Sequence, residues 1–233
     1  MKRFFPVAIA VLLFLGTAPV HAHGVHIEEV IKNPTVTCKT AFGVDVSAQI
    51  WDGLLDNPCL MGRLWEVYGF QPRYQVARSD TGFHVSDPSG ITGEIRQVGQ
   101  SDHVRTFYAT GRFDHWAVPS FFTAKGVAIL AYTRDRDRLA GEATIFLRGD
   151  NGISRFVMRI FSGILTRRIN KRLYSTLENI QTIIRDIAGE PHTVRDVLTG
   201  RWLTDFDRVF SVPGVRPTKD REVHSELPSQ MYR

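Results

Sequence analysis

The feature that most constrains the fold is a periodic apolar stripe across residues 153–188. Isoleucine, leucine and valine recur there at steps of three to five residues, which is the spacing of one helical face. The stripe consists of Ile153, Val157, Ile160, Ile164, Ile169, Leu173, Leu177, Ile180, Ile184 and Ile187. A helix of that length spans about 50 Å, which is too long for a connector. Because it follows a block with the pattern of strands, we expect it to lie across a sheet.

The preceding block, residues 72–148, has the pattern of antiparallel strands. Short β-prone runs are separated by Gly, Pro, Asp and Ser where hairpin turns belong. The runs span residues 73–78, 82–86, 92–98, 103–113, 125–134 and 139–148. Successive strands with short turns predict an antiparallel meander, since parallel strands need long crossovers. Gly111, Gly126 and Ala128 leave space on one side, and the pattern leaves open whether that space is a cavity or is filled by large neighbours.

Residues 35–68 complete the predicted fold class. Residues 35–40 are β-prone and alternate, so we expect a first strand there. A helix capped by Asp45 or Ser47 follows and ends near residues 56–58, and a second short helix covers residues 60–68. The sequence therefore predicts an α+β fold, in which a curved antiparallel sheet of six to seven strands grips one long C-terminal helix, with two short helices after the first strand.

The first 22 residues have the pattern of a secretory signal peptide. Lys2 and Arg3 precede an apolar run over residues 7–15, and residues 20–22 are small or neutral at the cleavage position. An uncleaved anchor is the competing interpretation, but the run is shorter than the roughly 20 residues of a spanning helix. We therefore expect a periplasmic or secreted protein.

About 210 residues remain after cleavage, enough for one domain and a tail. We place the domain at residues 33–189 and a C-terminal extension, partly disordered, at residues 190–233. Removal of the two basic residues of the signal lowers the formal net charge from +5 to +3. Export argues against a nucleic-acid partner. In an oxidising compartment Cys38 and Cys59 can form a disulfide, and two independent buried thiols are the equal alternative.

Two stretches resemble the START/Bet v 1-like superfamily, also called SRPBCC, whose architecture is the helix-grip fold. Residues 46–56, with the sequence VSAQIWDGLLD, look like the first helix of that group, and residues 169–180, INKRLYSTLENI, match the texture of its final helix. The resemblance covers roughly residues 35–188. It implies a hydrophobic ligand, such as a lipid or sterol, held between sheet and helix, and it supplies no catalytic residues. The tail after Pro191 departs from the family pattern.

The resemblance defines the candidate ligand-binding residues. They are Arg105, Phe107 and Tyr132 in the strands and Phe156, Phe161 and Leu165 in the long helix. Charged residues inside predicted strands, namely Glu94, Arg96, Arg105 and Glu142, are ordinary if they face solvent. On the concave side, an arginine such as Arg105 could instead anchor a carboxylate or phosphate head in an apolar pocket.

The leading hypothesis is therefore an exported protein that holds or transfers a lipid or another hydrophobic molecule. One alternative is a cyclase- or hydrolase-type enzyme that uses the same pocket with Asp114, His115 or Tyr132. Against it, adjacent strand residues such as Asp114 and His115 point to opposite faces. A third reading is a non-catalytic adaptor with a filled core. Metal-binding, phosphate-loop and Gly-x-Ser-x-Gly motifs are absent, so we expect neither a metal nor another cofactor.

The first two-thirds of the long helix is strongly basic. Its positive residues are Arg155, Arg159, Arg167, Arg168, Lys171 and Arg172. Such a patch can rest on anionic lipid headgroups during ligand delivery. The alternative is an ordinary solvated helix face.

Overall fold

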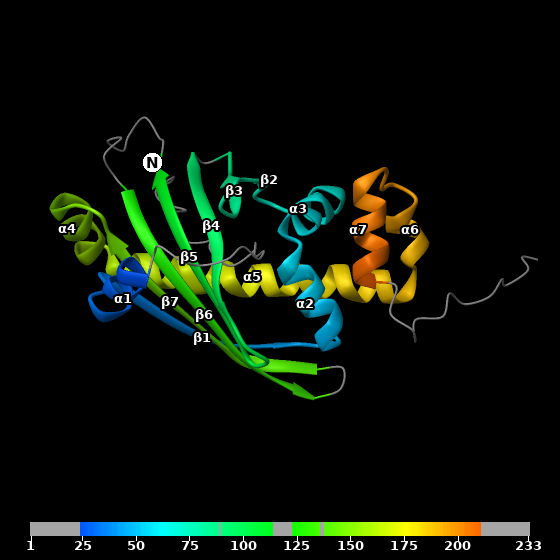
Figure 1. Cartoon of the computed structure of the whole chain (residues 1–233), viewed down its shortest axis with the longest axis horizontal. Helices are drawn as coiled ribbons and strands as arrows, with labels where there is room; N and C mark the ends of the chain where they lie inside the picture. The colour runs from blue at the N-terminus through cyan, green and yellow to red at the C-terminus, as the bar shows by residue number, and fades with distance from the viewer. Residues whose placement is uncertain (1–23, 89, 114–122, 136–137, 211–233) are drawn as a thin grey trace, which may run out of the picture.

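One curved sheet and a long helix across it organise the chain (Figure 1). The computed structural model describes residues 24–88, 90–113, 123–135 and 138–210. The strands are β1 (Val36–Val44), β2 (Gln75–Arg78), β3 (Phe83–Ser86), β4 (Ile91–Gln100), β5 (Val104–Phe113), β6 (Thr123–Asp135) and β7 (Arg138–Gly149). The helices are α1 (Gly24–Lys32), α2 (Ala48–Asp56), α3 (Pro58–Val67), α4 (Gly152–Ile160), α5 (Ser162–Gly189), α6 (Pro191–Arg195) and α7 (Arg201–Phe210). The proposed signal peptide, Asp114, His115 and the final tail lie outside the described residues.

The sheet has the order β1-β7-β6-β5-β4-β3-β2, and every neighbouring pair is antiparallel. Strands β2 to β7 form the expected meander, and β1 returns to pair with the last strand, from Val36 opposite Leu147 to Val44 opposite Leu139. The predicted fold class is confirmed: the chain is α+β, with a seven-stranded antiparallel sheet and a long helix after it.

The two faces of the sheet are covered by different helices. On β1, alternate residues from Val36 to Val44 are buried, and this inward face packs against α5. The main core joins the concave face of the sheet to α2, α3, α5 and α7. On the convex face a smaller cluster forms around Val30 of α1, Tyr108 and Val127.

Helix α1 was not predicted from the sequence, and it packs on the convex face of the sheet. Ile27, Val30 and Ile31 follow the spacing of one helical face and pack against the sheet. Arg148 fixes the helix from β7, because its guanidinium donates to a Glu29 carboxylate oxygen at 2.7 Å and to the Asn33 carbonyl at 2.7 Å. Three apolar residues within nine positions are too few for spacing alone to predict this helix.

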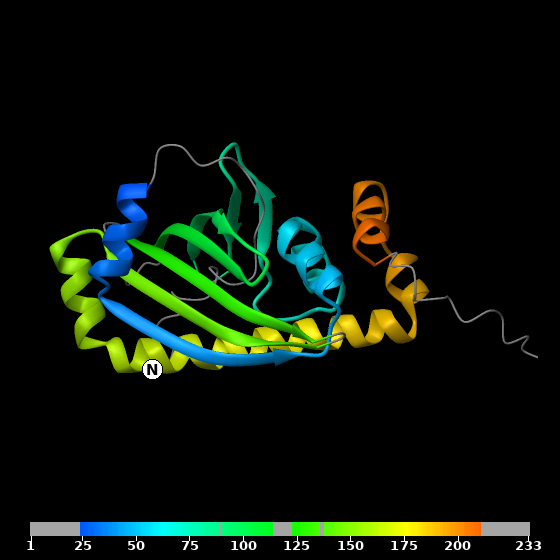
Figure 2. The same ribbon diagram turned by 60° about the horizontal axis from the view of Figure 1, so that its bottom comes forward.

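The single helix expected over residues 153–188 is two helices in the structure, which corrects that expectation. Helix α4 ends at Ile160, Phe161 is non-helical, and α5 runs on for 28 residues across the sheet (Figure 2). The chain changes direction because each helix packs on a different part of the sheet. Helix α4 rests on the end of β7, where a Cβ on Gly149 would come within 2.6 Å of the Arg155 nitrogen.

The segment after Gly189 folds back onto the core. Helix α7 contacts α2 and α3, and Phe206, Val209 and Phe210 are buried in the main core. The approach is close at Gly53 of α2, where an added Cβ would lie 3.1 Å from a methyl carbon of Val209. A glycine at this position therefore lets the two helices touch.

Both cysteines are free and buried, so the disulfide considered above does not form in the structure. Cys38 lies on β1 with its sulfur 3.7 Å from the Thr166 hydroxyl of α5, whereas Cys59 lies in α3. Burial raises the pKa of both thiols. The alternative of two independent buried thiols describes the structure.

Candidate binding site

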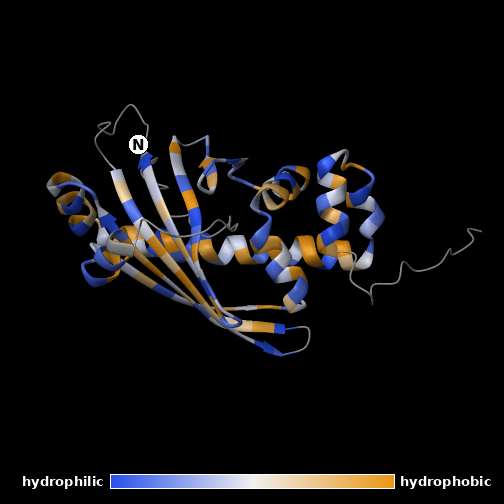
Figure 3. Cartoon of the chain, in the orientation of Figure 1, coloured by the Kyte–Doolittle hydropathy of each residue, from blue (hydrophilic) through white to orange (hydrophobic). Residues whose placement is uncertain are grey.

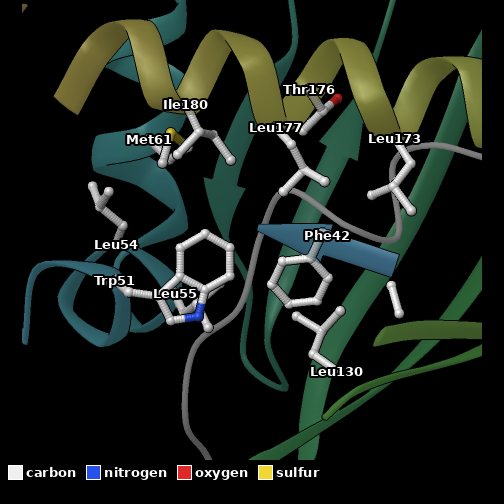
Figure 4. A pocket seen from close by; sticks show the side chains of 11 residues that line it. Phe42, Trp51, Leu54, Leu55, Met61, Leu130, Leu173, Thr176, Leu177 and Ile180 are labelled. Atoms are coloured by element: carbon white, nitrogen blue, oxygen red, sulfur yellow. The ribbon is translucent and has the colours of Figure 1, made fainter. Parts of the chain in front are cut away.

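A small apolar cavity lies beneath α5, between the concave face of the sheet and the helix pair α2–α3 (Figure 4). Its volume is about 20 Å³, close to the space that one water molecule needs. It is lined by Phe42, Trp51, Leu54, Leu55, Met61, Leu130, Ala143, Leu173, Thr176, Leu177 and Ile180. Among the described residues, the space expected between helix and sheet is therefore almost filled by side chains.

Local capping positions the helices that form the cavity wall. The Ser47 side chain accepts a hydrogen bond from the Ile50 amide and starts α2. Asn57 ends α2 and also caps α3, since its side chain accepts from the Leu60 amide at 3.3 Å. Helix α3 begins at Pro58, so Asn57 is the single residue between the two helices. Trp51 of α2 and Met61 of α3 therefore face the same cavity (Figure 4).

Aromatic contacts hold Trp51 of α2 against two strands of the sheet. Its ring stacks on Phe42 of β1, with centroids 5.9 Å apart, and meets the Tyr132 ring of β6 edge-on at 6.4 Å. Its indole nitrogen is buried, has no hydrogen-bond partner among the described residues, and points away from α5 (Figure 4). The Thr176 hydroxyl is also buried and has no hydrogen-bond partner within the described part of the chain. Apart from Trp51 and Thr176, the side chains that line the cavity are wholly apolar, which suits an apolar molecule.

An ion-pair cluster around one buried arginine attaches α2 to the sheet beside this cavity. We call it the α2 latch and define it as Arg105, Tyr132 and Arg134 of the sheet with Asp52 and Asp56 of α2. Arg105 is 1% exposed, and its two terminal nitrogens contact Asp52 at 3.0 Å and Asp56 at 2.7 Å. Tyr132 donates to Asp52 at 3.0 Å, and Arg134 reaches the other oxygen of that carboxylate at 2.8 Å.

The electrostatics of the latch keep Arg105 charged and Tyr132 protonated at neutral pH, because the pKa of each is raised. Burial acts to lower the pKa of Arg105, but hydrogen bonds with Tyr132 and Asp56 and the charges of both aspartates outweigh burial and raise it. Burial also raises the pKa of Tyr132. Tyr132 is therefore a protonated hydrogen-bond donor rather than a base.

The six candidate residues from the sequence separate into three groups. Arg105, Phe107 and Tyr132 lie on the concave side of the sheet and are buried, but none of them lines the cavity. Leu165 is buried at the start of α5, also outside the lining. Phe156 and Phe161 are 65% and 45% exposed at the surface, where α4 meets α5.

Arg105 differs most from its expected role as an anchor for a ligand head group. Both of its terminal nitrogens are engaged by Asp52 and Asp56, and Gln97 accepts from one of them at 3.2 Å. Asp52 and Asp56 lie at least 49 residues before Arg105 in the sequence, on a helix, and Gln97 lies on the neighbouring strand β4. Residue spacing therefore could not predict these contacts. The lining residue Trp51 belongs to residues 46–56, the stretch that resembles the first helix of the superfamily, but it was not among the candidate binding residues.

The other charged strand residues face outward. Glu94 contacts His84 at 3.1 Å, and Glu142 contacts Lys39 at 3.1 Å, both as exposed pairs. The Arg96 guanidinium lies 4.9 Å from the centre of the Tyr108 ring on the convex face. Of the four, Arg105 faces the concave side.

The described part of the chain contains no group of three His, Cys, Asp or Glu side chains placed to bind a metal ion. Within the same residues, no helix has the length and apolarity required to cross a bilayer.

Comparisons with known proteins give structural neighbours only. No family model matches the chain, and no curated protein matches it. A conserved protein of Geobacillus kaustophilus is 8% identical, with 65% of this chain and 97% of that chain covered and a TM-score of 0.45. A hypothetical protein of Helicobacter pylori is 10% identical, with 79% and 99% covered and a TM-score of 0.45. A protein from Arthrobacter aurescens is 11% identical, with 65% and 87% covered and a TM-score of 0.41.

Proposed function

We propose that the chain is an exported START-like helix-grip protein that binds a lipid or another apolar molecule between the sheet and α5. The order of elements supports the assignment to that superfamily: one strand, two short helices, a six-strand meander and a long helix. The observation that carries the ligand class is the cavity beneath α5, whose lining is apolar apart from Thr176.

The volume of the cavity defines how binding must occur. Pockets for small molecules typically measure about 300–1,000 Å³, so a cavity of about 20 Å³ must enlarge when a lipid enters. Helix α2 is the wall that we expect to move. It has nine residues, and its own latch residues Asp52 and Asp56 reach solvent. Helix α5, in contrast, has 28 residues and packs along β1. Ligand entry then requires the α2 latch to open.

A second candidate is an adaptor that functions with a filled core, and the water-sized cavity favours it. Such a protein would use its surface for a partner, and its interior would serve stability alone. The two candidates differ in whether material enters the space beneath α5.

The test is the composition of protein purified from its native compartment. We expect mass spectrometry of its organic extract to find an apolar molecule at about one per chain. A Leu177→Phe variant, which adds volume at the cavity, should lose that molecule. Leu203→Phe is the matched control, because Leu203 is also partly buried but lies on α7 and outside the lining.

Binding of a fluorescent fatty-acid analogue to the same three proteins gives a second readout. The parent and Leu203→Phe should bind it, and Leu177→Phe should bind at least tenfold more weakly. An empty parent protein that also fails to bind the analogue would overturn the carrier proposal in favour of the adaptor. Equal binding by all three proteins would place the ligand elsewhere.

A further inference from the structure

Large apolar side chains gather on the outside of the molecule where α4 meets α5. We call this surface the tip patch and define it as Ile153, Phe156, Ile160, Phe161 and Ile164. These side chains are 58%, 65%, 59%, 45% and 56% exposed. Together they present on the order of 500 Å² of apolar surface, at the upper end of what monomeric proteins expose. A surface patch of this size is often functional.

The orientation of α4 is fixed by its opposite face. Ser154 and Met158 are buried beneath the helix, and α4 contacts β7. Asn151 caps its start by accepting a hydrogen bond from the Ser154 amide at 2.7 Å. An amphipathic surface helix normally turns its apolar face to the core, but α4 turns Ile153, Phe156 and Ile160 outward. Within the part of the chain that the structure describes, the outward face is therefore available to a partner.

The tip patch is set in positive charge. From residue 151 to residue 177 the chain has six basic residues and no acidic residue. Arg159, Arg167, Arg168 and Lys171 are exposed. Arg172 turns inward instead and donates to the Tyr74 hydroxyl at 2.7 Å. An apolar face bordered by exposed arginine and lysine is complementary to the headgroup region of an anionic membrane, where apolar side chains enter the acyl boundary and basic ones meet phosphates.

The position of the patch suits contact with a flat surface. Helix α4 forms one end of the long axis of the molecule, and α6 and α7 lie at the other end (Figure 1). Hydrophobic residues are visible on α4 at that end (Figure 3). A planar partner can therefore reach the tip patch without meeting α2, α3 or α7.

We propose that the tip patch docks the protein on the surface of an anionic lipid bilayer. Phe156 and its apolar neighbours insert into the interface, and Arg159 and Arg167 contact lipid phosphates. The charge selects lipid over a second copy of this chain, because two copies would bring their basic helices together. The inference rests on α4 and stands whether or not a ligand enters beneath α5.

The experiment places an environment-sensitive label at the tip of the full chain. Phe156→Cys is labelled with nitrobenzoxadiazole, since Cys38 and Cys59 are buried and react slowly. Val197→Cys, 51% exposed near α6, carries the same label as the matched control. Each protein is titrated with vesicles of phosphatidylcholine and phosphatidylglycerol at 3:1, and with vesicles of phosphatidylcholine alone. A local label reports the tip itself, independently of any other lipid-binding segment.

We expect the label at position 156 to brighten and shift to the blue with the anionic vesicles only, and the label at position 197 to stay unchanged. Each basic residue near such a surface contributes about fivefold to partitioning. Arg159→Gln with Arg167→Gln should thus weaken the response about 25-fold, whereas Arg185→Gln, at the far end of α5, should leave it unchanged.

Three results would overturn the proposal. One is a silent label at position 156 in the presence of anionic vesicles. Another is an equal response at positions 156 and 197, which would show adsorption without a defined face. A change at position 156 that follows protein concentration without vesicles would assign the patch to self-association.

Discussion

Arg105→Ala should destabilise the protein strongly, because it removes the buried cation of the α2 latch. The side chain is 1% exposed and holds two carboxylates of α2. Breaking a buried ion pair from one side costs about 3–5 kcal/mol. Asp52 retains Tyr132 and Arg134, and Asp56 is 44% exposed and can rehydrate, so we expect the lower end, about 3 kcal/mol.

Two further variants divide that free energy of unfolding into charge and packing. Arg105→Met keeps an apolar stem in the same space and should lose about 1–2 kcal/mol less than Arg105→Ala. Asp56→Asn should cost less than about 1 kcal/mol, because this half of the cluster is solvated. Urea unfolding followed by tryptophan fluorescence measures all three. An unfolding midpoint for Arg105→Ala equal to that of the parent would refute the latch.

Gly53→Ala should stabilise the protein by about 1 kcal/mol in a Val209→Ala background, because alanine favours a helix more than glycine does. In the parent the gain should be much smaller, since a Val209 methyl carbon lies 3.1 Å from the new Cβ. A double-mutant cycle in unfolding free energy that shows no coupling would argue against this close packing. Burial raises the pKa of Tyr74 to about 12, from 10.0 in the unfolded chain. The stability linked to this group is therefore complete below pH 10 and falls by about 2–3 kcal/mol as the pH rises to 12. Tyr74→Phe should make the unfolding free energy depend less steeply on pH in this range. A thiol reagent at pH 8 should find two reactive thiols per chain after unfolding without reductant and almost none before; a denatured protein without thiols would contradict the free cysteines.

The meander from β2 to β7 was accessible from sequence because it depends on local signals, whereas the pairing of β1 with β7 was not predicted. Turn residues between the strands gave hairpins, and hairpins impose antiparallel neighbours, so the β2 to β7 meander could be predicted. The first strand was expected to end at residue 40, but β1 continues to Val44. Phe42, which lines the cavity, lies in that continuation.

The missed features depend on contacts between distant segments. The stripe through Ile153, Ile160 and Ile164 has helical spacing whether it faces core or solvent, and only the packing of Ser154 and Met158 on the sheet shows that it faces outward. In the sequence, Arg105 is likewise a charged residue inside a predicted strand. Only the structure shows that it forms ion pairs with Asp52 and Asp56 of α2. Periodicity gives the axis of a helix and its apolar side, but not the surface against which that side is placed.

The pairing of β1 with β7 has a consequence for the order of folding. Val44 and Leu139 are the partners closest in sequence, and almost 100 residues separate them, so loop closure makes this the slowest ladder of the sheet to form. The hairpins β4–β5, β5–β6 and β6–β7 can form before β1 pairs with β7. Helix α5 packs on β1, so the space beneath it closes only when this last ladder is complete. A hydrophobic molecule present during folding thus meets an open concave sheet before it meets a lid.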